Sequence, residues 1–545
     1  MARMTPDERR VVFASSLGTM FEWYDFFLYG ALAVNIAGNF FGQLPPASAF
    51  IFSLLAFAAG FVVRPIGALA FGRVGDLVGR KYTFLVTIVI MGLSTFLVGI
   101  LPGYQTIGIA APIILIVLRM LQGLALGGEY GAAATYVAEY APANRRGGWT
   151  SWIQTTSTGG LLLSLIVIIA VRKLVGSDFD AWGWRVPFLL SIVLLLLSVY
   201  VRFSLVESPA FKKIKAEEAL SKGPLSEAFL RPANFRIVAS VLFGLLVGQG
   251  VVWFTGLFYS MFFLIQALKI EAGMANVLVA IALALSAPFY IWFGKLSDRI
   301  GRKTVILSGC LIAAVTIFPV FKALTHYGNP ALETALAKSP VVFVADPADC
   351  SFQFNPTGTA VFSTSCDLAK QVLTANSAAY TQRDAPPGAL AKIVIGASEI
   401  PSFSATGLTR AASKGRLEDL RKAVSAGLAK AGYPSKADST TINQPAIVLL
   451  LLFLMVVSAM TLAPMAAALV ELFPTRIRYS AISLPYHIGN GWFGGLLPSI
   501  CFALVAMRGD IYFGLWYPVI GALVSVAIGS IFVRDHRGRD LQADI

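Results

Sequence analysis

Two carboxylates stand in the middle of an apolar run near the start of the chain. Glu22 and Asp25 are three residues apart in the segment FEWYDFFLYG, and Tyr29 follows Asp25 by four residues. On a helix this spacing puts the three side chains on one face, with Gly18 behind them. Two carboxylates held close together resist joint ionisation, so one of them can hold a proton near neutral pH. The trio therefore suits reversible proton binding, or it is a static cluster capped by the tyrosine or an arginine.

The apolar run over 107–138 carries an arginine and a glutamate. Arg119 and Glu129 are separated by ten residues, which is a rise of about 15 Å along a helix, so they lie at different depths. The guanidinium can bind a ligand carboxylate through two parallel hydrogen bonds, or it can serve as counter-ion to the first pair of carboxylates. Glu129 can relay protons or pair with Arg64 of an earlier run.

The elements that hold these charges must be membrane-spanning helices. The chain has 545 residues, of which 57% are hydrophobic and 13% charged, about half the charged fraction of soluble proteins. Runs of about 20 apolar residues cross a bilayer as helices, whose backbone hydrogen bonds close within each segment. The first run is too long and too charged for a cleavable signal peptide. We predict twelve spans, near 12–38, 49–71, 83–101, 107–138, 150–171, 185–202, 237–266, 275–293, 304–324, 445–470, 481–506 and 511–533.

The connections between the spans set the orientation. The connections on one side, with both chain ends, hold 24 Lys and Arg, whereas the short loops on the other side hold four. Because positive loops stay in the cytoplasm, we expect both termini to be cytoplasmic. The net charge of +14 then reflects this bias and contact with anionic lipid, and we expect no nucleic-acid partner.

One charged motif occurs twice. FGRVGDLVGRK at 71–81 and FGKLSDRIGRK at 293–303 align without gaps, 222 residues apart, and follow spans 2 and 8. Glycine allows tight turns and close helix approach, so we interpret both motifs as charged loops that act as hinges. The alternative is simple positive-inside anchoring, which explains the lysines but not the aspartates. The gating residues predicted from these motifs are Gly72, Asp76, Gly79, Arg80, Lys81, Gly294, Asp298, Gly301, Arg302 and Lys303.

A second repeated pair tests the internal symmetry. Glu139 and Arg146 follow span 4, and Glu471 and Arg478 follow span 10, each pair seven residues apart. The two pairs are farther apart in the sequence than the two copies of the first motif, because a polar segment, 327–443, lies between them. The two pairs can form an ionic latch between halves. We predict a bundle over 1–202, a cytoplasmic loop over 203–236, a second bundle over 237–324 and 445–534, an external insert over 325–444, and a cytoplasmic tail over 535–545.

The insert is expected to be a small α+β lid domain. VVFVA, SFQFN and AKIVIG are typical of short strands, and SKGRLEDLRKAVSAGLAKAG predicts a helix whose apolar stripe ends near Gly432. Cys350 and Cys366 lie on the oxidising side and can form a disulfide, or they remain two free thiols. Cys310 and Cys501 fall in membrane spans as packing residues.

At this point the sequence resembles a known family. The two six-helix halves, the repeated G-x-x-x-D-x-x-G-R-K motif and RMLQG resemble the major facilitator superfamily. FEWYDFFLYG, RPIG, GGEYGAAATYVAEYAP and RGRDL are similar to its metabolite:proton symporter family, which includes carriers of α-ketoglutarate, citrate, shikimate and proline or betaine. The resemblance covers all twelve spans but not the insert. The chain departs from the family pattern in the size of the insert and in His487, where asparagine is expected.

The resemblance implies a substrate site at the interface of the halves. Spans 5, 7 and 11 line the cavity of facilitator folds, although their aromatic residues can equally form interfacial belts. His487 titrates near neutrality, or it is a packing histidine. The implied proton-coupling residues are Glu22, Asp25 and Glu129. The substrate-binding candidates are Tyr29, Arg64, Arg119, Gln122, Gln154, Gln249, Trp253, Tyr259, Tyr486, His487 and Asn490.

We therefore expect a monomeric symporter of the inner membrane that imports a small organic acid by alternating access, driven by a proton gradient and without a cofactor. The alternatives are a proline or betaine carrier that holds the quaternary ammonium by cation–π contacts, and a sensor that uses the insert. A P-loop, a selectivity filter, clustered catalytic motifs and metal-ligand spacing are all lacking in the sequence, which argues against an ATP-driven pump, a channel, an enzyme and a metalloprotein.

Overall fold

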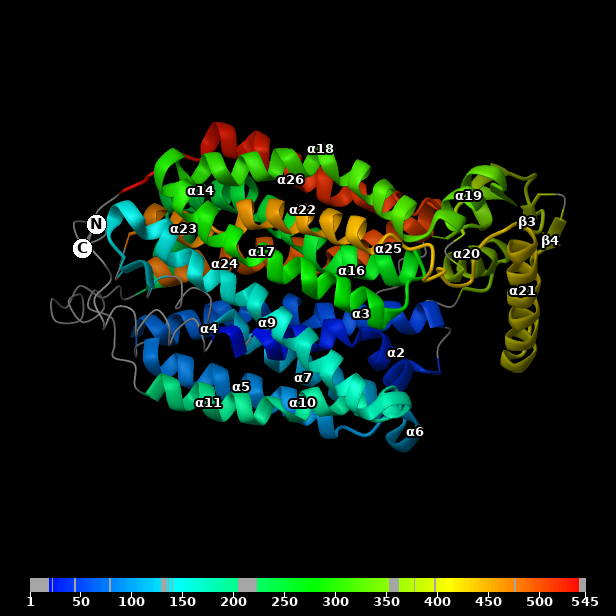
Figure 1. The fold of residues 1–545 in the computed structure, drawn as a ribbon, viewed down its shortest axis with the longest axis horizontal. Coiled ribbons are helices and arrows are strands. Elements are labelled where there is room, and N and C mark those ends of the chain that lie inside the picture. The colour runs from blue at the N-terminus through cyan, green and yellow to red at the C-terminus, as the bar shows by residue number, and fades with distance from the viewer. Residues whose placement is uncertain are drawn as a thin grey trace.

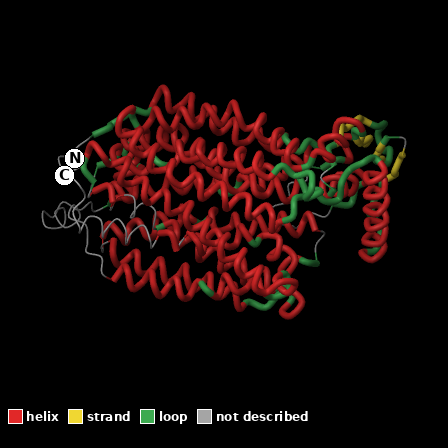
Figure 2. The backbone as a smooth tube through the Cα atoms, in the orientation of Figure 1, coloured by secondary structure: helices red, strands yellow, loops and turns green. Residues whose placement is uncertain are grey.

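The computed structural model describes residues 19–538, apart from 22, 44–45, 78–79, 129–134, 136, 140, 204–222, 352–361, 377, 397 and 475–476. Long helices form two bundles that lie side by side, and a small mixed domain caps one end (Figures 1 and 2). Within the described residues, ten helices are long and apolar enough to cross a membrane, and Leu85–Ile100 is a shorter apolar helix. The expected all-helical membrane fold is confirmed.

The first bundle comes from the N-terminal part of the chain, drawn in blue and cyan in Figure 1. Residues 23–31 are helical and lead into the next helix. The main elements that follow are α2 (Ala33–Phe41), α3 (Pro46–Val62), α4 (Arg64–Leu77), α5 (Arg80–Ile100), α7 (Ala110–Gly127), α9 (Arg146–Val175), α10 (Val186–Leu189) and α11 (Ser191–Phe203).

The second bundle comes from the C-terminal part. Its seventh span alternates α-helix with the π-helical stretches Leu242–Leu246, Thr255–Tyr259 and Phe263–Ala267, a deviation that often accompanies functional sites. The helices are α14 (Pro232–Val241), α15 (Val247–Phe254), α16 (Ser260–Phe262), α17 (Ala272–Ile300), α18 (Arg302–Gly328), α22 (Gln444–Leu462), α23 (Met465–Leu472), α24 (Arg478–Tyr486), α25 (Leu497–Arg508) and α26 (Trp516–Phe532).

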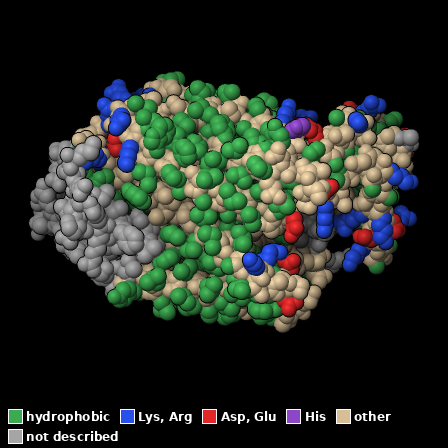
Figure 3. Space-filling view, viewed as in Figure 1, with side chains coloured by type: hydrophobic (Ala, Val, Ile, Leu, Met, Phe, Trp, Pro, Cys, Tyr) green, Lys and Arg blue, Asp and Glu red, His purple; other side chains and the backbone are tan. Residues whose placement is uncertain are grey.

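The surface of the bundles matches a lipid environment. On the face drawn in Figure 3, hydrophobic side chains cover the middle of the bundles, and charged side chains gather toward the ends and on the small domain. Large apolar residues of α17 and α18, such as Ile281, Trp292 and Val315, are exposed. In water such a belt would be unfavourable, whereas lipid solvates it.

The described residues of the repeated motifs lie almost entirely in helices, whereas we had expected loops. Residues Phe71–Leu77 belong to α4, and Phe293–Ile300 belong to α17, so their charged residues lie on helix ends. In the second motif a single residue, Gly301, separates two helices, and its φ angle is 104°. Only glycine adopts such an angle without strain. The interpretation as a loop was wrong because a one-residue break at glycine suffices to reverse the chain.

The small domain between α18 and α22 is an α+β unit, as expected. It contains the four strands β1 (Val341–Ala345), β2 (Tyr380–Asp384), β3 (Lys392–Ile395) and β4 (Ser398–Pro401), in the order β2-β1-β3-β4. Strand β2 runs parallel to β1, and the other two pairings are antiparallel. The predictions of β1 and β3 are confirmed, β2 and β4 were missed, and most of SFQFN lies outside the described residues.

Three helices complete this domain, α19 (Pro330–Lys338), α20 (Ser365–Ala375) and α21 (Arg410–Lys430). The predicted stripe of α21 is confirmed, since Leu420, Val424 and Leu428 are buried against the sheet side of the domain. In Figure 1, α21 runs across the direction of the membrane-spanning helices.

The domain docks mainly on the second bundle. Tyr380 donates its backbone N–H to the Gly509 carbonyl at 2.9 Å and its hydroxyl to the Ala506 carbonyl at 3.1 Å, just beyond and within the end of α25. Asn329 donates to the Leu268 carbonyl at 2.9 Å. Helix α20 contacts both α25 and α3 of the first bundle. The domain therefore touches both halves at this end of the molecule, which we call the insert end.

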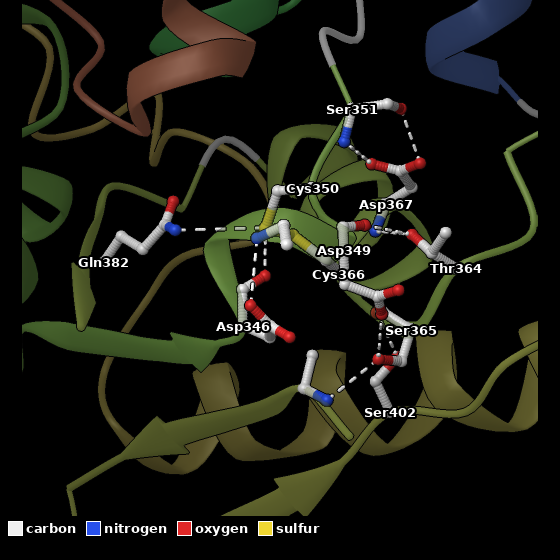
Figure 4. The surroundings of a disulfide bond; sticks show 12 residues. Asp346, Asp349, Cys350, Ser351, Thr364, Ser365, Cys366, Asp367, Gln382 and Ser402 are labelled. Atoms are coloured by element: carbon white, nitrogen blue, oxygen red, sulfur yellow. Dashed lines mark hydrogen bonds between the residues drawn. A yellow bond between two sulfur atoms is a disulfide. The ribbon is translucent and has the colours of Figure 1, made fainter. Parts of the chain in front are cut away.

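A disulfide joins Cys350 to Cys366 at the start of α20. Figure 4 shows a dense set of polar contacts around it, in which Asp367 accepts from Ser351 and Thr364 caps the helix by accepting from the Asp367 N–H at 3.1 Å. Nearby, backbone N–H groups of Gly388 and Ala348 hold the pKa of the exposed Asp346 carboxyl below its usual range. The bond thus fastens the loop before α20, the helix that contacts both bundles.

We predict that the double substitution Cys350→Ser with Cys366→Ser destabilises the small domain by roughly 3 kcal/mol, because the disulfide closes a loop of about 15 residues in the unfolded chain. Hydrogen exchange of amides in β1, β3 and α20 measures this loss. Dithiothreitol should reproduce the loss in the wild type and leave the double variant unchanged. Equal exchange in the two proteins would contradict the prediction.

Candidate functional site

Asp25 lies inside the first bundle. Its side chain is buried, it lies beside Thr95 of α5, and its Oδ1 atom has no hydrogen-bond partner among the described residues. Thr95 accepts a hydrogen bond from the Gln122 amide at 2.8 Å. Gln122 in turn accepts from Arg119. A polar chain therefore leads from Asp25 through two side chains to Arg119 without a direct ion pair, which separates the carboxylate from the guanidinium.

Arg119 lies on ring faces rather than against an acid. Its guanidinium carbon is 4.4 Å from the Tyr29 ring centre and 4.6 Å from that of Phe26. Its Nη1 donates to Gln122 and its Nη2 to the Phe26 carbonyl at 3.4 Å, while Nε is unpaired in the described structure. Two of its five N–H groups are therefore engaged within the first bundle, and the cation is covered by the Tyr29 and Phe26 rings.

Arg64 begins α4, two residues after the last residue of α3, Val62, and Pro65 is the second residue of α4. The side chain is almost fully buried and its guanidinium carbon lies 4.0 Å from the Phe61 ring centre and 5.7 Å from that of Trp23. Its Nε and Nη2 atoms have no partner within the described parts of the chain. The predicted pairing with Glu129 involves a residue outside the described structure, as does the predicted role of Glu22.

Aromatic side chains fill the space between the halves. Across the interface, Phe27 lies 5.1 Å from Phe258, Phe61 lies 5.1 Å from Phe254, and Trp23 lies 6.2 Å from Trp253, measured between ring centres. Rings in such tilted and edge-to-face contacts attract each other. We call this set the central aromatic cluster, and its members are Trp23, Phe26, Phe27, Phe57, Phe61, Trp253, Phe254 and Phe258.

The polar candidates of span 11 face the first bundle or span 7. His487 is buried, lies within electrostatic reach of Arg64, and faces the Gly127 backbone of the first bundle. Asn490 donates to Gln249 of α15 at 3.2 Å. These side chains come from α15 and from the π-helical stretch His487–Gly494 that follows α24. His487 thus brings a titratable group from one half next to a cation of the other.

The remaining predicted contacts are buried but differ in surroundings. Gln154 on α9 is buried in the first bundle, and Tyr486 packs its ring against His487. Tyr259 contacts Phe321 and Phe502, which belong to its own bundle. The structure therefore gathers Trp253, Tyr486 and His487 toward the interface and leaves Tyr259 within the second bundle.

A charge cluster lies at the end opposite the insert end. Arg146 donates to Glu471 at 2.8 Å, and Arg478 donates to Glu139 at 3.3 Å, so each glutamate pairs with the arginine of the other half. Arg302 adds contacts to Glu471 at 3.2 Å and Asp298 at 2.5 Å. The residues Glu139, Arg146, Asp298, Arg302, Glu471 and Arg478 form what we call the distal charge cluster.

The same cluster joins helix α9 to α17. Asp298 accepts the backbone N–H groups of Gly147 at 2.9 Å and Gly148 at 2.8 Å, in the first turn of α9. A carboxylate there satisfies free amide groups and favours the helix dipole. Gly147 and Gly294 face each other so closely that a Cβ at either would clash with backbone. Gly294 of the repeated motif therefore permits contact between the halves.

The other motif residues are placed only in part. Gly72 lies in α4 with the Tyr479 ring 3.5 Å from where its Cβ would be, and Lys303 donates to the Ser530 and Val533 carbonyls at 2.8 Å. Gly79 and the side chains of Asp76, Arg80 and Lys81 lie outside the described structure. The cross-half role of the first motif's aspartate stays a prediction.

The sequence reasoning missed most of the central aromatic cluster. The predicted substrate-binding residues include Trp253 but none of the phenylalanines, because a phenylalanine in an apolar span looks like any other core residue. The aromatic density of FEWYDFFLYG was an available signal. That these rings meet rings of span 7, however, depends on which faces the two bundles turn toward each other.

The comparisons with known proteins agree with this geometry. The family model "Sugar (and other) transporter" matches residues 11–231, and "MFS/sugar transport protein" matches residues 134–343. The chain is 36% identical over 322 residues to the proline/betaine transporter of Escherichia coli strain K12, covering 57% of this chain and 64% of that protein. The chain thus spans slightly less than two thirds of that relative.

Two further relatives are matched over more of their length. The shikimate transporter of E. coli K12 is 38% identical, with 58% of this chain and 72% of the relative covered. The inner membrane metabolite transport protein YhjE of the same strain is 35% identical, with 59% and 74% covered. Among solved structures, the proton:xylose symporter XylE superposes with a TM-score of 0.59 at 16% identity, covering 98% of both chains. With its two bundles, its repeated motifs and these relatives, this chain belongs to the major facilitator superfamily, among the sugar and metabolite transporters.

Proposed function

We propose that this protein is a proton-coupled symporter that imports a small zwitterion of the proline or betaine class by alternating access. The observation that carries the proposal is the central aromatic cluster, built from both halves beside two arginines that lack an acidic partner in the described structure. A proline/betaine transporter at 36% identity supports this substrate class above the organic acids that we first expected.

The chemistry of the site suits a molecule with one positive and one negative end. Faces of tryptophan and phenylalanine attract a quaternary ammonium by cation–π interaction. The fixed charges of Arg64 and Arg119 attract a carboxylate. Because Trp23 lies 5.7 Å from the Arg64 guanidinium and 6.2 Å from the Trp253 ring, a single small solute can experience both influences.

A small organic acid is the second candidate substrate. It is favoured by the same two arginines and by the shikimate transporter at 38% identity. An acid without a cationic end would use the arginines and leave the aromatic faces unused. The zwitterion uses both features.

Asp25 is the proposed proton carrier. Its carboxylate is buried, one oxygen lacks a partner in the described residues, and Thr95 and Gln122 connect it to Arg119. Protonation removes a charge from the membrane interior, where an isolated charge is costly. Uptake and release of this proton would therefore accompany movement of the substrate. Glu22, Glu129 and His487 are proposed to modulate it.

The distal charge cluster is proposed to be the cytoplasmic latch, with both chain ends on that side of the membrane. Its pairs join the halves, so they must break when the carrier opens to the cytoplasm and reform when it closes. The small domain at the opposite, external end acts as a lid in this scheme. A sensor role for that domain predicts intact transport but lost signalling on its removal.

The substrate class is tested by uptake into proteoliposomes. With an inward proton gradient, we expect accumulation of glycine betaine and proline, and collapse of that accumulation by an uncoupler. Shikimate, citrate and α-ketoglutarate complete the panel. Accumulation of these acids alone would favour the second candidate, and uptake of none of the compounds would overturn the proposed function.

We predict that Asp25→Asn abolishes accumulation against a gradient but retains substrate exchange, because the amide cannot carry a proton. The measurement is betaine uptake with and without a proton gradient, beside counterflow between equal concentrations. The matched control is Asp180→Asn, which neutralises an exposed carboxylate paired with Arg172 and should accumulate betaine as the wild type does. Gradient-driven accumulation by the Asp25→Asn protein would assign coupling to another residue.

We predict that Glu471→Gln weakens closure at the distal end, because the neutral amide loses its charge attraction to both Arg146 and Arg302. Removing one partner of a buried pair typically costs about 3–5 kcal/mol, so opening at this end should become populated. Distances between spin labels on exposed positions of α4 and α17 report it. Arg231→Ala breaks an exposed pair within one segment and should leave the distances unchanged. Unaltered distances in Glu471→Gln would refute the latch.

A further inference from the structure

Three polar side chains meet at the interface. They are Thr158 on α9 of the first bundle, Tyr290 on α17 and Trp253 on α15 of the second. The Tyr290 hydroxyl lies within reach of weak hydrogen bonds to both the Thr158 hydroxyl and the Trp253 ring N–H. None of the three groups makes a hydrogen bond of good geometry within the described residues. All three side chains are at most 2% exposed.

Leaving such groups unpaired inside a membrane protein is costly. A buried hydroxyl or indole N–H normally finds a partner, and each that does not loses the solvation it had in water. Here three groups without a well-formed hydrogen bond face one another. A ligand oxygen between them would supply the missing partner. Each of the three can donate a hydrogen bond, so the matching ligand atom is an acceptor.

The position of the cluster links it to the substrate path. Trp253 belongs to the central aromatic cluster, with its ring 5.8 Å from Phe27 and 6.2 Å from Trp23. Helix α9 packs along α17, and the two come from different halves. An acceptor bound here would contact both halves simultaneously. Such a contact forms and breaks as the halves rock.

From these contacts we infer that Tyr290, Thr158 and Trp253 form the subsite for the carboxylate of the transported solute. This inference rests on the proposed function and specifies its site. The face of Trp253 holds the ammonium end of a zwitterion, and its ring N–H, with the two hydroxyls, holds the carboxylate. Charge-assisted bonds from neutral donors to a carboxylate are stronger than neutral ones.

Arg119 is less suited to hold the carboxylate directly. One N–H of each terminal nitrogen already donates, to Gln122 and to the Phe26 carbonyl, and the cation lies on the rings of Phe26 and Tyr29. It therefore contributes positive potential from within the first bundle. The bidentate contact expected from the sequence is replaced in this scheme by three uncharged donors, which release their ligand more readily than a guanidinium clamp.

The test compares ligands that differ in the carboxylate. Binding to purified protein is measured by calorimetry for glycine betaine against choline, and for shikimate against its methyl ester. Tyr290→Phe and Thr158→Val each remove one donor without changing shape. Loss of one hydrogen bond to a charged group should weaken binding of both carboxylates about tenfold or more. Choline binding should not change, and the ester should lose less affinity than shikimate because its carbonyl accepts only a neutral hydrogen bond.

The control is Tyr24→Phe, which removes a buried hydroxyl that donates to the Pro187 carbonyl at 2.8 Å within the first bundle. This variant should bind all four ligands as the wild type does. Carboxylate affinity unchanged in Tyr290→Phe and Thr158→Val would overturn the subsite, as would equal weakening for choline and the ester.

The shikimate pair separates this inference from the proposed substrate class. If shikimate binds and betaine does not, the zwitterion proposal fails while the subsite is judged on the shikimate affinities. Wild-type protein that binds neither carboxylate overturns both.

Discussion

The architecture depends on the cost of placing charge inside an apolar, membrane-spanning bundle. Placing a charged side chain near the centre of a bilayer costs a few kcal/mol even on the lowest membrane-insertion scales. Each such charge is therefore expected to be stabilised by neighbouring groups or to serve the function of the protein. The protein uses two solutions. At the distal end, arginines meet glutamates and an aspartate. In the middle, Arg64 and Arg119 lie on aromatic rings. The rings stabilise the cations, and the positive charge remains available to attract a carboxylate ligand.

The internal repeat explains how the ion pairs of the distal charge cluster are arranged. Each half carries a glutamate and an arginine seven residues apart, and in the folded protein each glutamate pairs with the arginine of the other half. One motif, used twice, therefore yields a reciprocal connection that neither half can make alone. Asp298 strengthens it by capping the first turn of α9.

The small domain breaks the symmetry of the repeat. It is anchored on α25 through Tyr380 and reaches α3 of the first half through α20. The disulfide before α20 reduces the freedom of the segment that makes this bridge. The end of the molecule that carries the domain therefore has a connection between the halves with no counterpart in the repeated motifs.

Most of the fold and part of the site followed from the sequence. Apolar runs of membrane-spanning length and the two repeated motifs predicted a helical membrane carrier built of two halves, because lipid permits few alternatives for such segments. The structure has ten helices of spanning length and one shorter apolar helix among its described residues. Cysteine spacing and strand patterns predicted the disulfide, β1 and β3. The burial of Asp25, Arg64 and Arg119 was also predictable, because each stands inside an apolar run long enough to span a membrane.

The tertiary structure alone decided which side chains meet. A sequence gives the face of each helix but not the rotation and depth at which two bundles pack, so the exchange of partners between Glu139, Arg146, Glu471 and Arg478 required the fold. For the same reason Tyr290 and Thr158 appeared as ordinary residues of spans 8 and 5. Their convergence on Trp253 exists only because α9 and α17 pack together, with Gly147 and Gly294 allowing the backbones to touch.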